Sequence, residues 1–459
     1  MKNGFTPWLL TVEVQIATKM KLSYWFLLFV AAASVSTASS HNCSVNVVAH
    51  SDANIHPAFN ELVPVLSSLP EAVEFIAAAV SSSNGLLEQD LTVCIFGMHL
   101  LSQPVVVDHR CTSASDARII WLGYDATVSG AIQLQSWQQV VGSTYSVKVP
   151  SSFTGPTIRD VWPAGRRASR STLQSPDQVL GQMTPWQSSD GSVGFSTEKD
   201  IPAEWQHNSA SIEFVWPIVV ANWIEPRCCV SSIKGRNVTL ADPCGALLIK
   251  RNVYAKTLAP PVRIEAVPSS SNTPSPGSFY HDTGAGMLYY TLSSDQTVAD
   301  LEARSFTTAM ESLLVVSNTS QHSWINVSFQ FSTWFQPNLP AGFVDTQSCV
   351  HAFDQEGSAA EPPAAVTIAA SSDIEISGCT FSSIGSPYAL LAGSSSNRIN
   401  ITSSYFYDLS GGAVREPCTS FLPLSRPALR HLLTTDVTCP QVWEMSSAST
   451  TVSQTAPCC

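Results

Sequence analysis

The chain has 459 residues, of which 44% are apolar and 13% are charged, and this charged share is about half of that usual in soluble proteins. With 35 acidic and 23 basic residues the formal net charge is −12, so the clustered Lys and Arg of a nucleic-acid surface are not expected. These values exclude nucleic acid as a partner and indicate a neutral, hydroxyl-rich surface around an ordinary apolar core.

The first forty residues have the pattern of an export signal. Met20 and Lys21 precede an uncharged apolar block at residues 22–33, and a run of small residues then ends at Ser40. We predict a signal peptide over residues 1–40, with a possible start at Met20, and a secreted protein. A signal anchor is the alternative, but its uncharged stretch is at the short end for a membrane span, so no stable membrane insertion is expected.

Cysteines and glycosylation sequons also favour export. Twelve cysteines suit an oxidising compartment. The candidate glycan acceptors are Asn42, Asn237, Asn318, Asn326 and Asn400. Cys228 or Cys229 could form a local disulfide with Cys244, and Cys94 with Cys111 is a second candidate pair, while the connectivity stays open at this point. No C-x-x-C pair accompanies spaced histidines, so no metal site is predicted.

Residues 41–136 are predicted to form an N-terminal cap and the first strands. Residues 59–80 place apolar side chains at spacings of three and four, which predicts an amphipathic helix that Asn84 and Gly85 end. Short strand-like runs follow at residues 92–96, 104–107, 118–122 and 126–128, separated by glycines and polar residues. A helix before the first coil would cover a β-edge that otherwise recruits other chains.

Residues 137–261 lack a regular period and are rich in Trp, Pro and Arg. We predict an inserted, mostly β subdomain here, which lies against the coils and then returns to them. Arg166, Arg167 and Arg170 cluster in this segment and could contact uronic or sulfated sugars through bidentate hydrogen bonds. Salt bridges between the insert and the coils are the favoured interpretation.

A repeat near the end of the chain indicates the fold. Four apolar residues recur after 25 positions: Ile374, Ile376, Phe381 and Ile384 reappear as Ile399, Ile401, Phe406 and Leu409. A parallel β-helix needs such a period, because one turn cannot bury its apolar face alone and must stack on the next turn. We therefore predict an all-β fold with parallel β-helix coils over residues 262–415.

The order of several motifs resembles a family of secreted right-handed parallel β-helix proteins with a pectin-lyase-like fold, related to glycoside hydrolases. The matching segments are GMHLLSQPVVV (97–107), IIWLGYDATVSGAIQLQSW (119–137), VWPAGRRASRS (161–171), SIEFVW (211–216), PVRIEAV (261–267) and PGSFYHDTGAGMLYY (276–290). The resemblance spans most of residues 45–415. It implies a right-handed solenoid with a capping helix, a polysaccharide or other glycan as the partner, and no cofactor.

The resemblance ends after Arg415. Residues 416–459 show no strand alternation, five prolines interrupt them, and an irregular or disordered tail is expected. Related proteins continue through several more coils at this point. Either an altered transcript or gene model has replaced the later coils, which would leave the product inactive, or the tail is natural.

Carboxylates on the coils are the candidate catalytic residues, because acid–base cleavage of a glycosidic bond needs two of them. Glu375 lies between Ile374 and Ile376 and should therefore point outward, but Asn400 rather than a carboxylate follows it one coil on. Asp408 is the other candidate, although a solvated turn residue is its favoured interpretation.

Aromatic residues are the candidate sugar contacts. Tyr405 and Tyr407 flank Phe406, so they point outward if Phe406 is in the core, and their rings can then stack on sugars. Trp324 and Trp334 are assigned to the core. Two functions follow: an enzyme of glycoside hydrolase type, or a noncatalytic glycan-binding or extracellular structural protein.

Overall fold

The computed structural model describes residues 43–49, 63–216, 225–251, 258–267, 274–335, 337, 344–345, 351–353, 359–360, 362–393 and 395–415. All of them belong to one unit, Cys43–Cys459. Strands dominate the described part of this unit, as the predicted all-β class requires, and the longest described helix, α2, has 14 residues. The predicted signal peptide, the sequon at Asn42 and the predicted tail lie outside the described residues.

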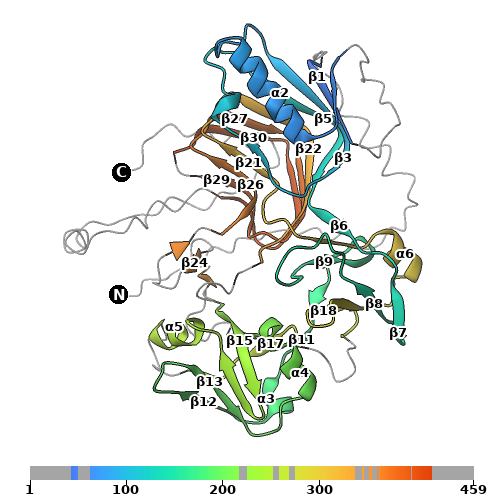
Figure 1. Ribbon diagram of the computed structural model, residues 1–459, viewed down its shortest axis with the longest axis vertical. Coiled ribbons are helices and arrows are strands. Elements are labelled where there is room, and N and C mark those ends of the chain that lie inside the picture. The colour runs from blue at the N-terminus through green and yellow to red at the C-terminus, as the bar shows by residue number, and fades with distance from the viewer. Residues whose placement is uncertain are drawn as a thin grey trace, which may run out of the picture. The chain divides into compact units, whose positions relative to one another are not determined.

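Parallel strands that are far apart in the sequence lie side by side, as β5 and β22 show in Figure 1. One sheet has the order β2 (Val65–Leu66), β1 (Val45–Val48), β3 (Leu91–Leu100), β5 (Ile119–Ser129), β22 (His322–Ser332), β27 (Ser372–Ser377) and β30 (Asn397–Thr402), and β28 (Thr380–Ile384) and β31 (Tyr405–Leu409) continue it beside β22. The other contains β4 (Val105–Val107), β21 (Leu314–Ser317), β26 (Ala364–Ala369), β29 (Tyr388–Ala392) and β32 (Gly412–Arg415). We call these two sheets the parallel stack.

The strand register confirms the predicted repeat of 25 residues. Ile374 pairs with Ile399 between β27 and β30, and Phe381 pairs with Phe406 between β28 and β31. Between the preceding pair of strands, β22 and β27, paired residues are 52 positions apart, as the contact between Ser323 and Glu375 shows. A small sheet of β23 (Val344–Asp345), β24 (His351–Phe353) and β25 (Ala359–Ala360) belongs to the longer segment between β22 and β26.

Left-handed backbone conformations recur at the same steps. Phe331, Ser383 and Asp408 have φ angles of 62°, 55° and 51°. A second set consists of Gln321, Asp373 and Arg398, with φ angles of 62°, 57° and 52°. Positive φ is uncommon outside glycine, and these six residues include aromatic, hydroxyl, acidic, amide and basic side chains. The left-handed backbone at these two corners of each layer is therefore set by the stacking of one layer on the next rather than by local sequence.

Apolar side chains from successive layers form one core within the parallel stack. The rings of Phe329 and Phe381 are 5.2 Å apart, and those of Phe381 and Phe406 are 4.7 Å apart with nearly parallel planes. Trp324 is 1% exposed and stacks on Trp121 at 4.5 Å, so its predicted core role is confirmed. Offset stacking of aromatic rings adds to the free energy of burial.

Helix α2 (Leu69–Ser82) begins later than predicted. Ser68 caps it by accepting a hydrogen bond from the backbone N–H of Glu71, and Pro70 occupies the first turn. These are strong start signals, and the preceding β2 pairs with β1 instead of extending the helix. Ile76 and its apolar neighbours on α2 are buried in the core of the parallel stack, as expected for a cap.

One pair of predicted strands is a single strand in the structure, and a further strand is longer than predicted. β5 (Ile119–Ser129) joins the predicted runs 118–122 and 126–128, and β3 continues past Gly97 to Leu100. Gly97 has a φ angle of 77°, and the register of β3 against β5 shifts between Phe96 and Met98. From one pair to the next the register advances by two residues on β3 and by three on β5, so the extra residue of this bulge is in β5. Gly97 lies opposite it and does not end β3.

Between β5 and β21 the chain forms mostly antiparallel sheets, which we call the antiparallel region (residues 131–308). Their orders are β10-β18-β19-β8-β7, β11-β17-β14-β15-β16-β13-β12 and β6-β20-β9. The strands are β6 (Ala131–Gln133), β7 (Gln138–Val141), β8 (Thr144–Lys148), β9 (Val161–Trp162), β10 (Ser169–Arg170), β11 (Thr172–Leu173), β12 (Met183–Gln187), β13 (Val193–Thr197), β14 (Glu213–Val215), β15 (Arg227–Lys234), β16 (Asn237–Leu240), β17 (Arg263–Glu265), β18 (Ser278–Asp282), β19 (Met287–Thr291) and β20 (Phe306–Thr308). The helices are α3 (Pro176–Leu180), α4 (Ala203–His207), α5 (Cys244–Arg251) and α6 (Val298–Ala303).

The pairing in this region extends beyond the predicted insert at residues 137–261. β18 pairs with β10, β19 with β8, and β20 with β6 and β9. The described strands return to the parallel stack at β21. No helix among the described residues is long and apolar enough to cross a membrane.

Buried charges hold the antiparallel region together. The side chain of Glu213 is 2% exposed and contacts three arginines: Arg159, Arg170 at 3.0 Å and Arg227 at 3.4 Å. Arg227 also contacts Glu265 at 2.7 Å. Burial alone would raise the pKa of Glu213, but Arg159 and Arg170 hold that pKa well below its ordinary value. The ionised pairs therefore lie on one face of β14, and Phe214 on the other face belongs to an apolar core.

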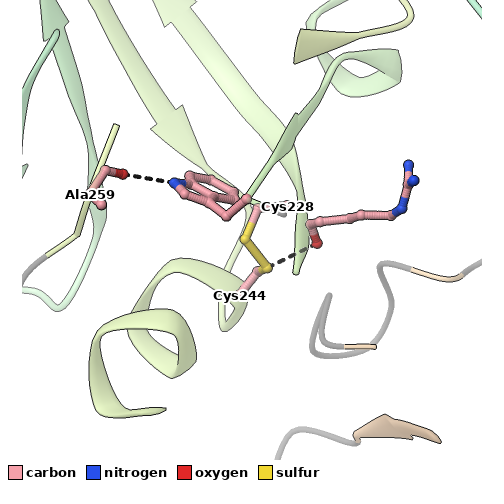
Figure 2. Close-up of a disulfide and its surroundings, with 5 residues drawn as sticks. Cys228, Cys244 and Ala259 are labelled. Atoms are coloured by element: carbon pink, nitrogen blue, oxygen red, sulfur yellow. Dashed lines mark hydrogen bonds between the residues drawn. A yellow bond between two sulfur atoms is a disulfide. The ribbon is translucent and has the colours of Figure 1, made fainter. Parts of the chain in front are cut away.

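Two disulfides are formed by the described cysteines. Cys228 bonds Cys244, which agrees with the predicted local disulfide, and Figure 2 shows this bond beside Ala259. Cys94 bonds Cys43, so the predicted pairing of Cys94 with Cys111 is wrong. Cys94 lies with Phe96 and Ile120 on the face of the sheet that points away from the core of the parallel stack. Cys111 is buried in that core, so the two sulfur atoms lie on opposite sides of the sheet.

Candidate functional site

Outward side chains form columns across the strands of the parallel stack. Phe329, Phe381 and Phe406 are directed into the core, so the residues on either side of them face outward. The strand registers define two columns, which we call the Tyr405 column (Met98, Thr127, Ser328, Thr380, Tyr405) and the Tyr407 column (Leu100, Ser129, Gln330, Ser382, Tyr407). Hydroxyl and amide side chains thus connect an apolar end to an aromatic end.

The aromatic end has the geometry predicted for a stacking platform. Tyr405 is 70% exposed and Tyr407 is 58% exposed. Phe406 lies between them and packs on Phe381 with ring planes 4° apart, which holds β31 in register. The two phenol rings are therefore presented to solvent by a strand whose position is determined by the core.

The apolar end of the columns adjoins a hollow of about 390 Å³. Met98 and Leu100 line it together with Ser67, Ser68 and Gln103. Leu100 is 64% exposed and Met98 is 42% exposed, so both side chains remain accessible next to this hollow. The Tyr405 column and the hollow together offer an uncharged surface across β3, β5, β22, β28 and β31. In the Tyr407 column, Ser129 and Ser382 are buried, and Leu100, Gln330 and Tyr407 are the accessible members.

Glu375 lies on β27, on the outward side of the sheet as predicted. Its side chain is 35% exposed, its Oε2 accepts a hydrogen bond from Ser323 Oγ at 3.0 Å, and the Arg118 guanidinium is 3.9 Å away. In the register, Glu375 lies between Ser323 and Asn400. Among the described residues, no second carboxylate occupies this column.

Asp373 lies near Glu375 but is paired with an arginine. Both oxygens of Asp373 accept hydrogen bonds from Arg398 at 2.5 Å, and these bonds lower the pKa of Asp373. Arg118 donates to the backbone carbonyl of Asp373 at 3.1 Å. Asp373 is therefore held as an anion and does not supply the protonated partner that acid–base cleavage requires.

Asp408 connects the parallel stack to the antiparallel region. Its Oδ1 accepts from Arg167 Nε at 2.7 Å and its Oδ2 accepts from Trp162 Nε1 at 2.8 Å. Arg167 also donates to Asp160 at 2.7 Å, and the other oxygen of Asp160 accepts from Thr333. Each carboxylate oxygen of this pair therefore has a protein donor, so the arrangement serves as a structural clamp.

Sequence reasoning did not predict this clamp, although two of its residues lie in one of the segments that carry the family resemblance. Arg167 and Trp162 both belong to the segment VWPAGRRASRS, and the guanidinium lies 4.8 Å from the centre of the Trp162 ring. The other two arginines of the segment also form ion pairs, Arg166 with Asp295 and Arg170 with Glu213. The predicted salt bridges join the insert and the coils: Arg167 forms such a contact with Asp408, whereas Arg166 and Arg170 pair within the antiparallel region.

The sequons differ in accessibility. Asn237, Asn318 and Asn326 are exposed, whereas Asn400 is half-buried and its side-chain oxygen is buried without a hydrogen-bond partner. Trp334, assigned to the core from sequence, is half-buried. In the described part of the chain, no cluster of three His, Cys, Asp or Glu residues could hold a metal ion.

No known protein family and no curated protein matches this sequence. A solved structure described as "Glycoside hydrolase" is similar over 82% of this chain and 67% of its own chain, with 15% identity and a TM-score of 0.59. A structure of XylC with xylose is 9% identical over 81% of this chain and 64% of its own chain, but its TM-score of 0.22 is too low to indicate a shared fold. The chain thus shares a mostly β fold with a glycoside hydrolase.

Proposed function

We propose that this chain is a secreted, right-handed parallel β-helix protein of glycoside hydrolase type that binds polysaccharide across the outward side of its parallel stack. The register steps of 25 and 52 residues and the recurring left-handed corners support the β-helix. The disulfides agree with export. In this proposal the coils are interrupted by the antiparallel region, and residues 1–40 and 416–459 are the signal peptide and the tail.

The observation that carries the proposal is the pair of exposed tyrosines at the end of the two columns. Large apolar rings are seldom left exposed side by side without a partner, and the pyranose ring has an apolar face that packs on an aromatic ring. Tyr405 and Tyr407 are held apart by Phe406 on one strand, so both can contact the same chain of sugars.

Glu375 is the candidate acid or base if the protein also cleaves its ligand. It is accessible, and the Ser323 hydroxyl orients one of its oxygens. A glycosidase uses two carboxyl groups about 5 to 9.5 Å apart, and no second carboxylate occupies the column of Glu375 among the described residues. The oxygens of Asp160 and Asp408 already accept hydrogen bonds from Arg167, Trp162 and Thr333. This observation favours the second candidate function, noncatalytic glycan binding.

Binding and hydrolysis can be tested separately with the full chain. Affinity electrophoresis against a panel of plant and algal polysaccharides should detect retardation, and replacing both tyrosines with Ala should weaken binding about tenfold, because each ring contributes about 0.5–1.5 kcal/mol. Tyr405→Phe and Tyr407→Phe keep the rings and should retain binding. The proposal fails if no polysaccharide retards the protein.

Release of reducing ends from the bound polysaccharide decides between the two functions. An enzyme that uses Glu375 should lose this activity by at least a hundredfold in Glu375→Gln while its binding is unchanged. A protein that binds but releases no reducing ends in its unaltered form is a glycan-binding protein.

A further inference from the structure

We propose that the ligand of this surface is a neutral polysaccharide rather than a polyuronate or a sulfated glycan. This inference rests on the proposed function and specifies its ligand. It depends on the charges of the outward side chains, which are independent of the tyrosine geometry.

The two columns contain no charged side chain. Between the tyrosines and the apolar end lie the hydroxyls of Thr127, Ser328 and Thr380 and the amide of Gln330, and each of these side chains is half-exposed. Hydroxyl and amide groups both donate and accept hydrogen bonds, as sugar hydroxyls do. The described surface thus matches a ligand that offers hydroxyls and apolar ring faces.

The arginines beside the columns are already paired with carboxylates. Arg398 forms a bidentate pair with Asp373, and Arg118 lies against Glu375 and the backbone of Asp373. A sugar carboxylate that displaced Asp373 from Arg398 would lie beside the displaced carboxylate, and this repulsion would offset the new contact.

The arginine at the other edge of the columns, Arg167, is also paired with carboxylates. Arg167 donates to Asp160, to Asp408 and to the backbone carbonyl of Ile384, so its donors are directed into the protein. One guanidinium faces two carboxylates here, and the cluster is net negative. A polyanion would meet no unneutralised cation among the described side chains on either edge.

The charge of the whole chain acts in the same direction. A net charge of −12 repels a polyanion before contact, whereas it has no effect on the approach of a neutral chain. From Met98 to Tyr405 the column crosses five strands, a distance of about 19 Å at the usual spacing of about 4.8 Å between strands. A linear glycan can therefore contact one outward side chain after another.

Binding of matched neutral and anionic polysaccharides tests this inference. Xyloglucan, mannan and mixed-linkage β-glucan are compared with polygalacturonate, alginate and carrageenan by calorimetry at 50 and 500 mM NaCl. We expect saturable binding to at least one neutral polymer, with a dissociation constant that changes less than twofold with salt, and no binding to the anionic ones.

Variants connect the result to the columns and to the paired arginines. Thr380→Ala should weaken binding of the neutral polymer severalfold, whereas Thr367→Ala, on β26 of the other parallel sheet, should not. Asp373→Asn releases Arg398 and should introduce measurable binding to polygalacturonate, whereas Asp295→Asn, which releases Arg166 in the antiparallel region, should not.

The outcomes separate this inference from the proposed function. Salt-sensitive binding to an anionic polymer alone, or equal binding to both classes, would overturn the inference and leave the proposed function intact. Binding to no polymer would refute the proposed function, and the inference with it.

Discussion

The parallel stack and the antiparallel region both bury apolar clusters, but the antiparallel region adds a buried network of carboxylates and arginines. In the stack, the same apolar side chain recurs in successive layers, as Phe381 and Phe406 do at 4.7 Å. In the antiparallel region, Glu213 and Glu265 lie buried among arginines that do not recur at a fixed step in the sequence. A repeated apolar pattern can therefore specify a stack of layers, whereas a non-repeating region needs contacts that only one arrangement of its strands satisfies.

A physical reason connects each chemistry to its region. Apolar residues tolerate a neighbour of the same kind one layer away, but like charges at about 5 Å repel one another. A buried ion pair can therefore not be repeated layer after layer. In the antiparallel region strand β14 has different neighbours on its two sides, so Glu213 can be surrounded by Arg159, Arg170 and Arg227. We expect these pairs to determine strand order more than stability.

The largest expected effect tests the buried charges. Glu213→Ala leaves Arg159, Arg170 and Arg227 without their shared carboxylate, and we expect a loss of about 3–5 kcal/mol in the free energy of unfolding. Urea unfolding measures it. Asp200→Ala is the control, because Asp200 is 85% exposed in its pair with Arg236, and it should cost less than about 1 kcal/mol. Equal losses would contradict the contrast between buried and exposed pairs.

Acid titration compares a buried histidine in each region. Burial lowers the pKa of His322 in the stack and of His281 in the antiparallel region from 6.5 to about 4. Between these values the unfolded chain binds protons that the folded chain does not, so stability should fall as the pH decreases from about 6.5 to about 4. One pKa unit corresponds to about 1.4 kcal/mol, so the loss for His322 is on the order of 3 kcal/mol.

Urea unfolding between pH 7.5 and 4 in single variants measures these contributions. His322→Gln and His281→Gln should each flatten part of the decline, whereas His109→Gln, with a side chain 76% exposed, should leave it unchanged. Below about pH 4.5 a further loss should follow, because the lowered pKa of Glu265, about 2, adds stability that disappears as pH falls through that value. A flat profile from pH 6.5 to 4 in the unaltered protein would contradict the assignment.

The disulfide of the antiparallel region should contribute a similar amount. Cys228 and Cys244 are 16 residues apart, and a crosslink over such a loop stabilises by about 3 kcal/mol. Replacing both with Ser should lower the free energy of unfolding by this amount under oxidising conditions. The same comparison under reducing conditions is the control, since the unaltered protein then lacks the bond as well and the difference should disappear. A disulfide contribution below about 1 kcal/mol would contradict this expectation.

The smallest expected effect compares two layers of the stack at one register position. Ile376 is fully buried, and Ile376→Val should cost about 0.5–1.5 kcal/mol. Ile401 pairs with it one layer on and is half-buried, so Ile401→Val should cost less. Thermal or urea unfolding of both variants decides the order. The reverse order would show that the last described layer is as tightly packed as the one before it.

Sequence reasoning succeeded where the signal was periodic. The alternation around Phe406 predicted exposed tyrosines, and the period of 25 predicted the partners of Ile374 and Phe381, because both depend on neighbours at a fixed step. It failed where partners are distant and unique. Cys43 with Cys94 and Trp162 with Asp408 are 51 and 246 residues apart, and no local pattern relates them.

Buried charges were missed for another reason. Glu213 and Glu265 occur in the short segments SIEFVW and PVRIEAV, where a single charged residue is most often solvent-exposed. Alternation would place Glu213 on the face opposite Phe214, which is correct, but that face is covered by arginines from three other segments. Only the arrangement of the sheets shows that this second face is also interior.

The contact between Arg167 and Asp408 has a consequence for how the molecule is made. These residues are 241 positions apart, and contacts of such high sequence separation form slowly. Ribosomes release the chain from its N-terminus at about 5–20 residues per second, so Arg167 emerges many seconds before its partner. During this interval the antiparallel region can fold on its own sheets but cannot close the clamp. A nascent chain that stalls before residue 408 would leave Arg167 and Asp160 accessible, and proteases or chaperones could distinguish it from the finished protein.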